Sequence, residues 1–156
     1  LIGETVGLEW FYPTQTDSYG SNGQQVVGAG VEYPNGCCGF GTVYVDVSDS
    51  GFTVGPSGSV LNFSTGSFNG FRLDSVTGSA FNSVSYLGGD LAVVGVTVEN
   101  GSIFANFAGQ GVLSTAESPF AQFSFTLADD ATAVPAPATL ALLGLGLLGL
   151  RLRRKA

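Results

Sequence analysis

Three aspartates are the residues of this sequence whose chemistry best suits catalysis. Asp46 and Asp74 lie in segments that alternate like strands, and Asp90 lies between two such segments. Two carboxyl groups about 5 to 10 Å apart can hydrolyse a glycosidic bond. The sequence does not place any two of the three together, and solvated acids are the more common outcome in an acidic protein. A carboxylate-pair glycosidase is therefore the weakest of the functions considered.

Several other catalytic chemistries are excluded because the sequence contains no histidine. A serine or cysteine nucleophile then lacks its usual base, and zinc lacks a common nitrogen ligand. The one lysine, Lys155, belongs to the C-terminal tail, and the glycines form no phosphate-binding or dinucleotide fingerprint. We therefore predict that the protein is not an enzyme and holds no cofactor and no metal.

Residues 46–51, DVSDSG, partly match the start of a calcium loop. An EF-hand loop needs Glu at its twelfth position, where this sequence has Ser57. A turn explains the segment better, because Asp, Ser and Gly are common turn residues. A calcium site at Asp46 or Asp49 is kept as a minor alternative.

Two further groups of residues leave alternatives open. The adjacent Cys37 and Cys38 can form a vicinal disulfide, bond to another chain or stay as free thiols, and an oxidising compartment favours oxidation. Trp10, Phe11 and Tyr12 form an aromatic cluster that could stack on sugar rings as part of a carbohydrate-binding module. Burial within a strand is the more common fate of such a cluster.

The elements that must position these residues are strands. Short segments rich in β-branched and aromatic residues are separated by turn signals such as residues 34–36, PNG, and residues 100–101, NG, while residues 14–23 have a loop composition. We predict an all-β body over residues 1–128, a β-sandwich or jelly roll of about nine or ten strands. The expected strands are 5–12, 24–33, 42–47, 52–54, 59–64, 68–76, 83–87, 91–99, 102–107 and 120–127.

The core should come from alternate positions of these strands, because successive side chains point to opposite faces of a sheet. Each buried Val or Phe contributes about 1.5 to 3 kcal/mol. The sets expected to face inward together are Val43, Val45 and Val47; Val94, Val96 and Val98; and Phe123, Phe125 and Leu127.

The C-terminal segment differs in character from the body. Residues 129–133, DDATA, are a polar linker, and an apolar run from 138 to 150 contains seven leucines in 13 residues. As a helix this run rises about 20 Å, against about 30 Å for a bilayer core. We predict a weak, removable transmembrane helix over 138–150, since an apolar surface all round does not suit a helix packed on a soluble core. The span residues are Ala138, Leu140, Leu142, Leu143, Leu145, Leu147, Leu148 and Leu150.

Charge is divided sharply between the body and this tail. All 12 acidic residues lie at or before Asp130, and the one cation before residue 134 is Arg72. Basic residues beside a span mark its cytoplasmic side, so we expect a cytoplasmic C-terminus and an acidic body across the membrane. The acidic body also disfavours nucleic-acid partners, which need cations. Four cations follow the span: Arg151, Arg153, Arg154 and Lys155.

The tail as a whole resembles the PEP-CTERM sorting signal of Gram-negative bacteria. The resemblance rests on about 23 of the 156 residues, 134–156, in which a short motif, the apolar span and the basic end follow one another. Ala136 occupies a position where the family usually has Glu. The motif residues are Val134, Pro135, Ala136 and Pro137.

The resemblance implies a partner and a destination. PEP-CTERM signals are handled by an exosortase, a membrane cysteine protease or transpeptidase, and often accompany extracellular polysaccharide production. We therefore expect a secreted, noncatalytic protein that passes through the inner membrane to the cell surface or matrix, with extracellular polysaccharide as a further candidate partner. The sequence begins at Leu1 without an export signal, so we expect that a signal has been removed or is missing here.

Overall fold

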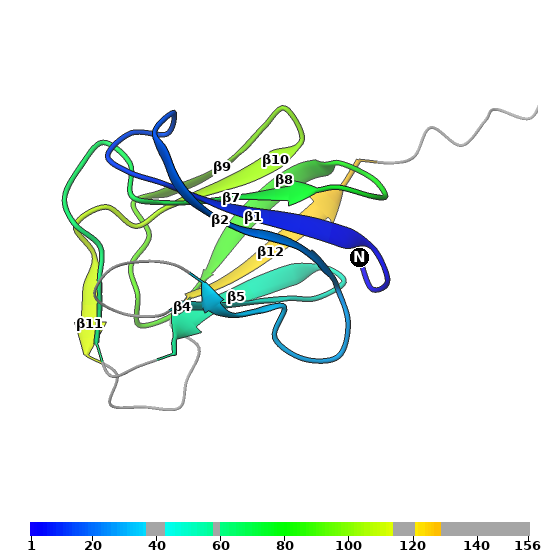
Figure 1. The fold of residues 1–156 in the computed structure, drawn as a ribbon, viewed down its shortest axis with the longest axis horizontal. Coiled ribbons are helices and arrows are strands. Elements are labelled where there is room, and N and C mark those ends of the chain that lie inside the picture. The colour runs from blue at the N-terminus through cyan, green and yellow to red at the C-terminus, as the bar shows by residue number, and fades with distance from the viewer. Residues whose placement is uncertain (37–42, 58–59, 114–120, 129–156) are drawn as a thin grey trace, which may run out of the picture.

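The fold is a sandwich of two antiparallel sheets. The computed structural model describes residues 1–36, 43–57, 60–113 and 121–128. Ten strands form two five-stranded sheets (Figure 1). A separate two-stranded sheet pairs β6 (Val60–Asn62) with β11 (Gly111–Leu113). The predicted all-β sandwich of about ten strands is confirmed.

Each large sheet combines strands that are far apart in the sequence. Sheet A has the order β2-β1-β7-β10-β9, and sheet B has the order β3-β4-β5-β12-β8. The strands of sheet A are β1 (Thr5–Phe11), β2 (Ser18–Val26), β7 (Gly70–Ser75), β9 (Gly95–Glu99) and β10 (Ser102–Asn106). Those of sheet B are β3 (Tyr33–Gly36), β4 (Val43–Val47), β5 (Gly51–Pro56), β8 (Phe81–Gly88) and β12 (Ala121–Leu127).

The core lies between the sheets and is rich in aromatic rings. In β4, Val43, Val45 and Val47 are buried and alternate with half-buried residues, as predicted. Phe123 and Phe125 of β12 are also buried, as predicted. Between the sheets, Phe71 of sheet A meets Phe52 of sheet B with ring centroids 5.9 Å apart. Such edge-to-face contacts add to the free energy gained by removing apolar area from water.

Three expectations for the early part of the chain are wrong. Residues 18–26 form β2, although 14–23 had been expected to be a loop. The expected strand over 24–33 ends at Val26, and Gly30 has a φ of +123°, which favours glycine. Residues 34–36 belong to β3 rather than to a free turn. The strand β2 was not predicted because it lies at the edge of sheet A and consists mostly of exposed polar residues. Such a sequence shows no alternation of apolar and polar residues.

A further difference concerns the strand expected over 91–99. The strand β9 begins at Gly95, and Leu91 is buried in the segment before it. Val94 is 56% exposed, so its expected inward orientation is wrong, whereas Val96 and Val98 pack against the core. The short strand β11 was not expected at all. The run of apolar residues from 91 to 98 therefore combines a loop with an edge strand.

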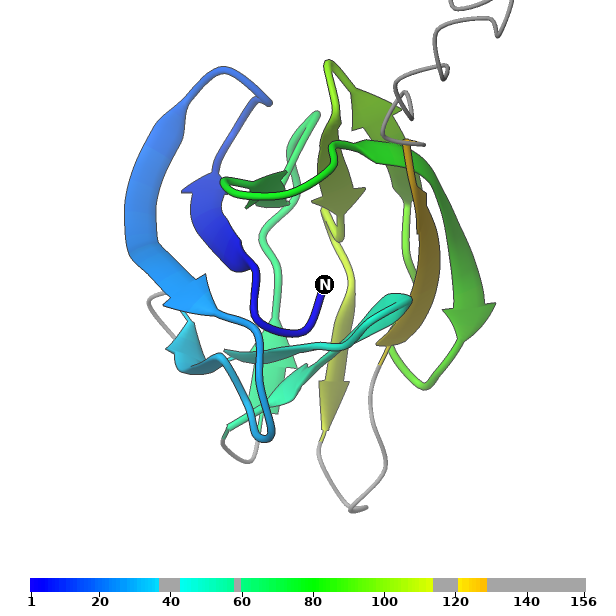
Figure 2. The same cartoon turned by 90° about the vertical axis from the view of Figure 1, so that its right-hand side faces the viewer.

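The last of the described strands, β12, ends at one end of the sandwich, where several turns also lie. Leu127 pairs with Phe81, and the Ala128 amide donates to the carbonyl of Ala80. The β4–β5 turn lies at the same end, because the Phe125 amide donates to Ser50. Figure 2 looks at this end, with the N-terminus of the chain near the centre of the view. The linker and the tail, including the helix expected over 138–150, lie outside the described residues.

Candidate functional site

The aromatic cluster near the start of the chain does not offer a sugar-stacking surface. Trp10 is fully buried, and its Nε1 donates to Oδ1 of Asn22 at 2.7 Å. Phe11 is 5% exposed and packs against Phe68 and Phe104. Tyr12 alone is partly open, at 38%. Burial in the strand thus accounts for the cluster, and the sugar-stacking interpretation of these three residues is wrong.

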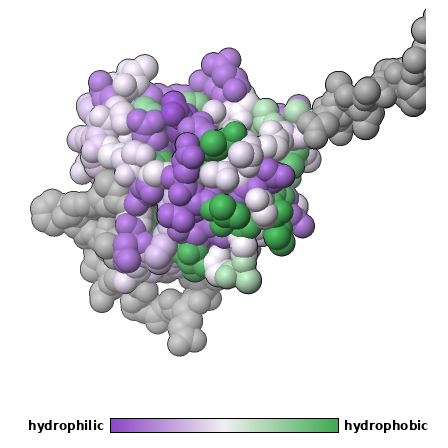
Figure 3. All heavy atoms as spheres, turned by 45° about the vertical axis from the view of Figure 1, so that its right-hand side comes forward, coloured by the Kyte–Doolittle hydropathy of each residue, from purple (hydrophilic) through white to green (hydrophobic). Residues whose placement is uncertain are grey.

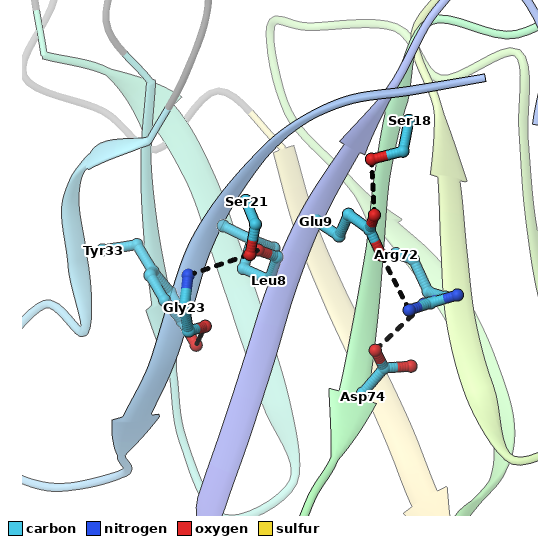
Figure 4. Close-up of polar contacts among 8 residues, drawn as sticks. All are labelled: Leu8, Glu9, Ser18, Ser21, Gly23, Tyr33, Arg72 and Asp74. Atoms are coloured by element: carbon cyan, nitrogen blue, oxygen red, sulfur yellow. Dashed lines mark hydrogen bonds and ion pairs between the residues drawn. The ribbon is translucent and has the colours of Figure 1, made fainter.

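Arg72 forms a closed ion cluster on the outer face of sheet A (Figure 4). Its Nη2 is 2.8 Å from Oε2 of Glu9, and its Nε is 2.9 Å from Oδ2 of Asp74. Ser18 donates to the other oxygen of Glu9, and the guanidinium lies 5.6 Å from the centre of the Phe11 ring. The register of β1 and β7 explains the cluster, because Glu9 pairs directly with Arg72. The one guanidinium holds both carboxylates in place across β1 and β7, so we interpret the cluster as structural.

A second group of polar contacts in Figure 4 joins β3 to the edge of sheet A. The Tyr33 hydroxyl donates to the carbonyl of Val6 at 2.7 Å and also lies 3.4 Å from that of Gly23. Burial, followed by the charge of Glu32, raises the pKa of Tyr33 to about 12. This buried hydroxyl ties the two sheets together and has no free side for a ligand.

The three aspartates considered for catalysis are not brought together. Asp74 is held by Arg72 on the outer face of sheet A, whereas Asp46 lies on β4 of sheet B, opposite Thr53. Asp90 is an exposed residue between β8 and β9. Asp46 and Asp74 therefore lie on outer faces of different sheets with the core between them.

The carboxylate that does approach Asp46 belongs to Glu32, which no motif in the sequence indicates as functional. Both oxygens of Glu32 accept backbone hydrogen bonds, Oε1 from Gly28 at 3.0 Å and Oε2 from Val47 at 2.7 Å. Glu32 thus fastens the β2–β3 loop to β4. Both oxygens of Glu32 are thus engaged by backbone amides, and we interpret this carboxylate as structural.

The turn with the partial calcium-loop pattern is held by its own contacts. The Ser48 amide donates to the Gly51 carbonyl at 2.8 Å, and the Ile2 amide donates to Oδ1 of Asp49 at 2.9 Å. Within the described residues, no three Asp, Glu, Cys or His side chains converge as metal ligands. Cys37 and Cys38 lie outside the described residues.

Asp46→Asn is expected to raise the melting temperature near pH 7 and to leave it unchanged at about pH 3. Burial, and then the nearby Glu32, raise the pKa of Asp46 above its ordinary value of 3.8. A carboxyl group whose pKa is raised in the folded state lowers the stability of the protein once the pH is high enough to ionise it. The variant with the neutral amide avoids this loss, so it should be more stable than the parent protein near pH 7. Thermal unfolding followed by circular dichroism at both pH values measures the effect, with the exposed Asp90→Asn as control. An equal gain at both pH values would contradict the explanation.

A hollow lined by both polar and apolar residues lies on the outer face of sheet B. It has a volume of about 360 Å³ and crosses β4, β5, β12 and β8. Register explains the arrangement, because Asp46 pairs with Thr53, and Thr53 pairs with Gln122. The residues that line it are Asp46, Ser48, Ser50, Gly51, Phe52, Thr53, Leu87, Gln122, Phe123 and Ser124.

The sequence indicates Asp46 as a candidate for chemistry, whereas Phe123 of the hollow was expected only in the core. The β4–β5 turn could have placed Thr53 opposite Asp46, because a short hairpin fixes its own register. No local pattern could place Gln122 and Leu87 beside these residues, because other strands separate β8 and β12 from β5 in the sequence. An irregular register at residues 122–123 adds Leu87 to the hollow.

Comparison with known proteins addresses the tail rather than the sandwich. No curated protein and no solved structure is significantly similar to this chain. A family model described as the PEP-CTERM protein-sorting motif matches residues 133–155. The tail is a PEP-CTERM sorting signal. It marks the protein as an exosortase substrate, which confirms the resemblance found in the sequence.

The PEP-CTERM signal lies entirely outside the described residues, so the roles assigned to its individual positions stay predictions. This applies to the motif residues 134–137, the span 138–150 and the four cations of the basic end. Among the residues that the structure does describe, no helix has the length and hydropathy to cross a bilayer.

Proposed function

We propose that the protein is a noncatalytic exported protein that exosortase processing delivers to the cell surface or extracellular polysaccharide matrix. The observation that carries the proposal is the PEP-CTERM motif at residues 133–155, directly after the sandwich. The motif implies an exported, membrane-processed protein. The cations at its end support an intermediate whose C-terminus faces the cytoplasm.

A noncatalytic role is supported by the arrangement of the acids. Asp74 is paired with Arg72, and Asp46 lies on the other sheet beside Glu32, whose oxygens hold backbone amides. The sequence also contains no histidine that could serve as a base. The sandwich is therefore proposed to act through binding or structure rather than through a reaction.

The short linker constrains how the sandwich meets the membrane before processing. Ten residues, 128–137, separate the end of β12 from the span predicted to begin at residue 138, and fully extended they reach about 35 Å. The end of the sandwich near Leu127 is therefore the part of the sandwich tethered nearest to the bilayer. Val26 and Val76, which flank Thr5 at this end, are 62% and 43% exposed. Hydrophobic patches among hydrophilic residues are visible on this side in Figure 3.

The mass of the C-terminus in cells with and without the exosortase tests the sorting proposal. With the enzyme present, the mature protein should lack the apolar run and the basic end, whereas without it the full tail should remain. Replacing Ala136 by Glu, the usual residue of the family, should increase the processed fraction. Identical C-terminal masses in the two strains, for both the parent and Ala136→Glu, would rule out exosortase processing.

A further inference from the structure

Three polar side chains of the hollow on sheet B are free to bind a ligand. Among the described residues, the side chains of Thr53, Gln122 and Ser124 have no hydrogen-bond partner. On the outer face of sheet A, by contrast, the charged side chains of Glu9, Arg72 and Asp74 are paired with one another. A hydroxyl and an amide both donate and accept hydrogen bonds, which is the capacity that sugar hydroxyls require.

An aromatic ring lies directly beside this hollow. Tyr44 is two residues before Asp46 on β4 and therefore lies on the same face of the sheet. Its ring covers Gly55 of the neighbouring strand, where an added Cβ would lie 2.4 Å from Cε1 and 2.5 Å from Cζ. The ring thus rests against the sheet surface because Gly55 has no side chain. Aromatic rings held in this way provide an apolar face beside polar groups.

We propose that the outer face of sheet B binds an uncharged hexose polysaccharide, with Tyr44 as the stacking platform and the adjoining hollow as the hydrogen-bonding surface. A volume of about 360 Å³ lies at the small end of the range for ligand sites, roughly 300 to 1,000 Å³. A hollow of this size holds about one or two sugar rings, so a longer polysaccharide would cross the outer face of sheet B with only part of its length in the hollow. The inference goes beyond the proposed sorting function and does not depend on it.

The acidic side chains near the hollow favour uncharged polysaccharides over acidic ones. Asp46 lines the hollow and Glu32 lies beside it. Arg72, the one basic side chain among the described residues, lies on the outer face of the other sheet. A polymer of uronic acids would bring its carboxylates toward these acids, and like charges that meet at an interface weaken binding. An uncharged chain avoids this repulsion.

Calorimetric titration of the full chain tests the proposal. The protein is kept in a zwitterionic detergent without a sugar headgroup and titrated with hexasaccharides of β-1,3-glucan, β-1,4-glucan and α-1,4-glucan, and with hexagalacturonate. At least one glucan should bind, and hexagalacturonate should bind at least tenfold more weakly. Gln122→Ala should weaken glucan binding about fivefold, and Tyr44→Ala tenfold or more.

Matched controls come from the exposed surface of β2 in sheet A. Gln24→Ala and Tyr19→Ala remove the same side-chain types far from the hollow and should leave the affinity unchanged. Because Tyr44 packs on Gly55, its variant is compared by melting temperature, whereas Gln122 is exposed and its loss should not affect folding. The proposal is wrong if no glucan binds, if hexagalacturonate binds equally well, or if Gln122→Ala has no more effect than Gln24→Ala. C-terminal processing should be the same in all these variants.

Discussion

Replacing Phe71 by alanine should lower the free energy of unfolding by about 3 to 5 kcal/mol. Phe71 is fully buried and contacts rings from both sheets and from the connection after β10: Trp10 at 5.3 Å, Phe52 at 5.9 Å and Phe107 at 6.0 Å between centroids. Its removal takes away apolar burial and leaves a cavity between two sheets that cannot close without shifting both. Urea unfolding followed by far-ultraviolet circular dichroism measures the loss.

The matched control is Phe104→Ala on the neighbouring strand β10. Phe104 is half-buried on the outer face of sheet A, where it contacts Phe11 and Phe68. Its side chain is still partly in water in the folded protein, so its removal should cost less than half as much as the removal of Phe71. Equal losses for the two variants would mean that the sandwich interior contributes no more to stability than its outer surface.

Local patterns in the sequence predicted the parts of the fold that depend on local physics. The alternating Val43, Val45 and Val47 predicted both β4 and its buried face, because a half-buried strand repeats every two residues. The tail was predicted for a similar reason, since its motif, span and basic end are contiguous in the sequence and a family model matches them.

Long-range pairing produced the features that the sequence did not reveal. The strand β2 has little apolar content and is ordered by its pairing with β1, which includes two register irregularities. The hollow on sheet B likewise exists only once β12 pairs with β5, placing Gln122 opposite Thr53. Its aromatic partner is Tyr44 rather than the more conspicuous Trp10, which is buried. Composition alone cannot distinguish an aromatic residue on an outer face from one in the core.

Replacing Gly70 by alanine is expected to destabilise the protein by about 3 kcal/mol or more. A Cβ at this position would lie 1.8 Å from the carbonyl oxygen of Ala105 and 3.2 Å from the Cα of Asn106. Both atoms belong to the backbone of β10, which pairs with β7. The steric overlap can therefore be removed only if the two strands move apart. Gly70 also pairs with Phe11 of β1, so the displacement would extend to a third strand of sheet A.

Gly95→Ala is the control, because Gly95 pairs with the same residue, Asn106, from the other side. No atom lies within 4 Å of a Cβ at Gly95, so alanine should cause no loss and could gain up to about 1 kcal/mol by restricting the unfolded chain. The urea concentrations at the midpoint of unfolding, measured for the two variants and the parent protein, give the stability changes to be compared. If both glycines tolerate alanine equally, the close approach of β7 and β10 cannot be the reason for glycine at position 70. A large loss at Gly70 alone would show that the backbones of β7 and β10 approach too closely at this position to admit a side chain.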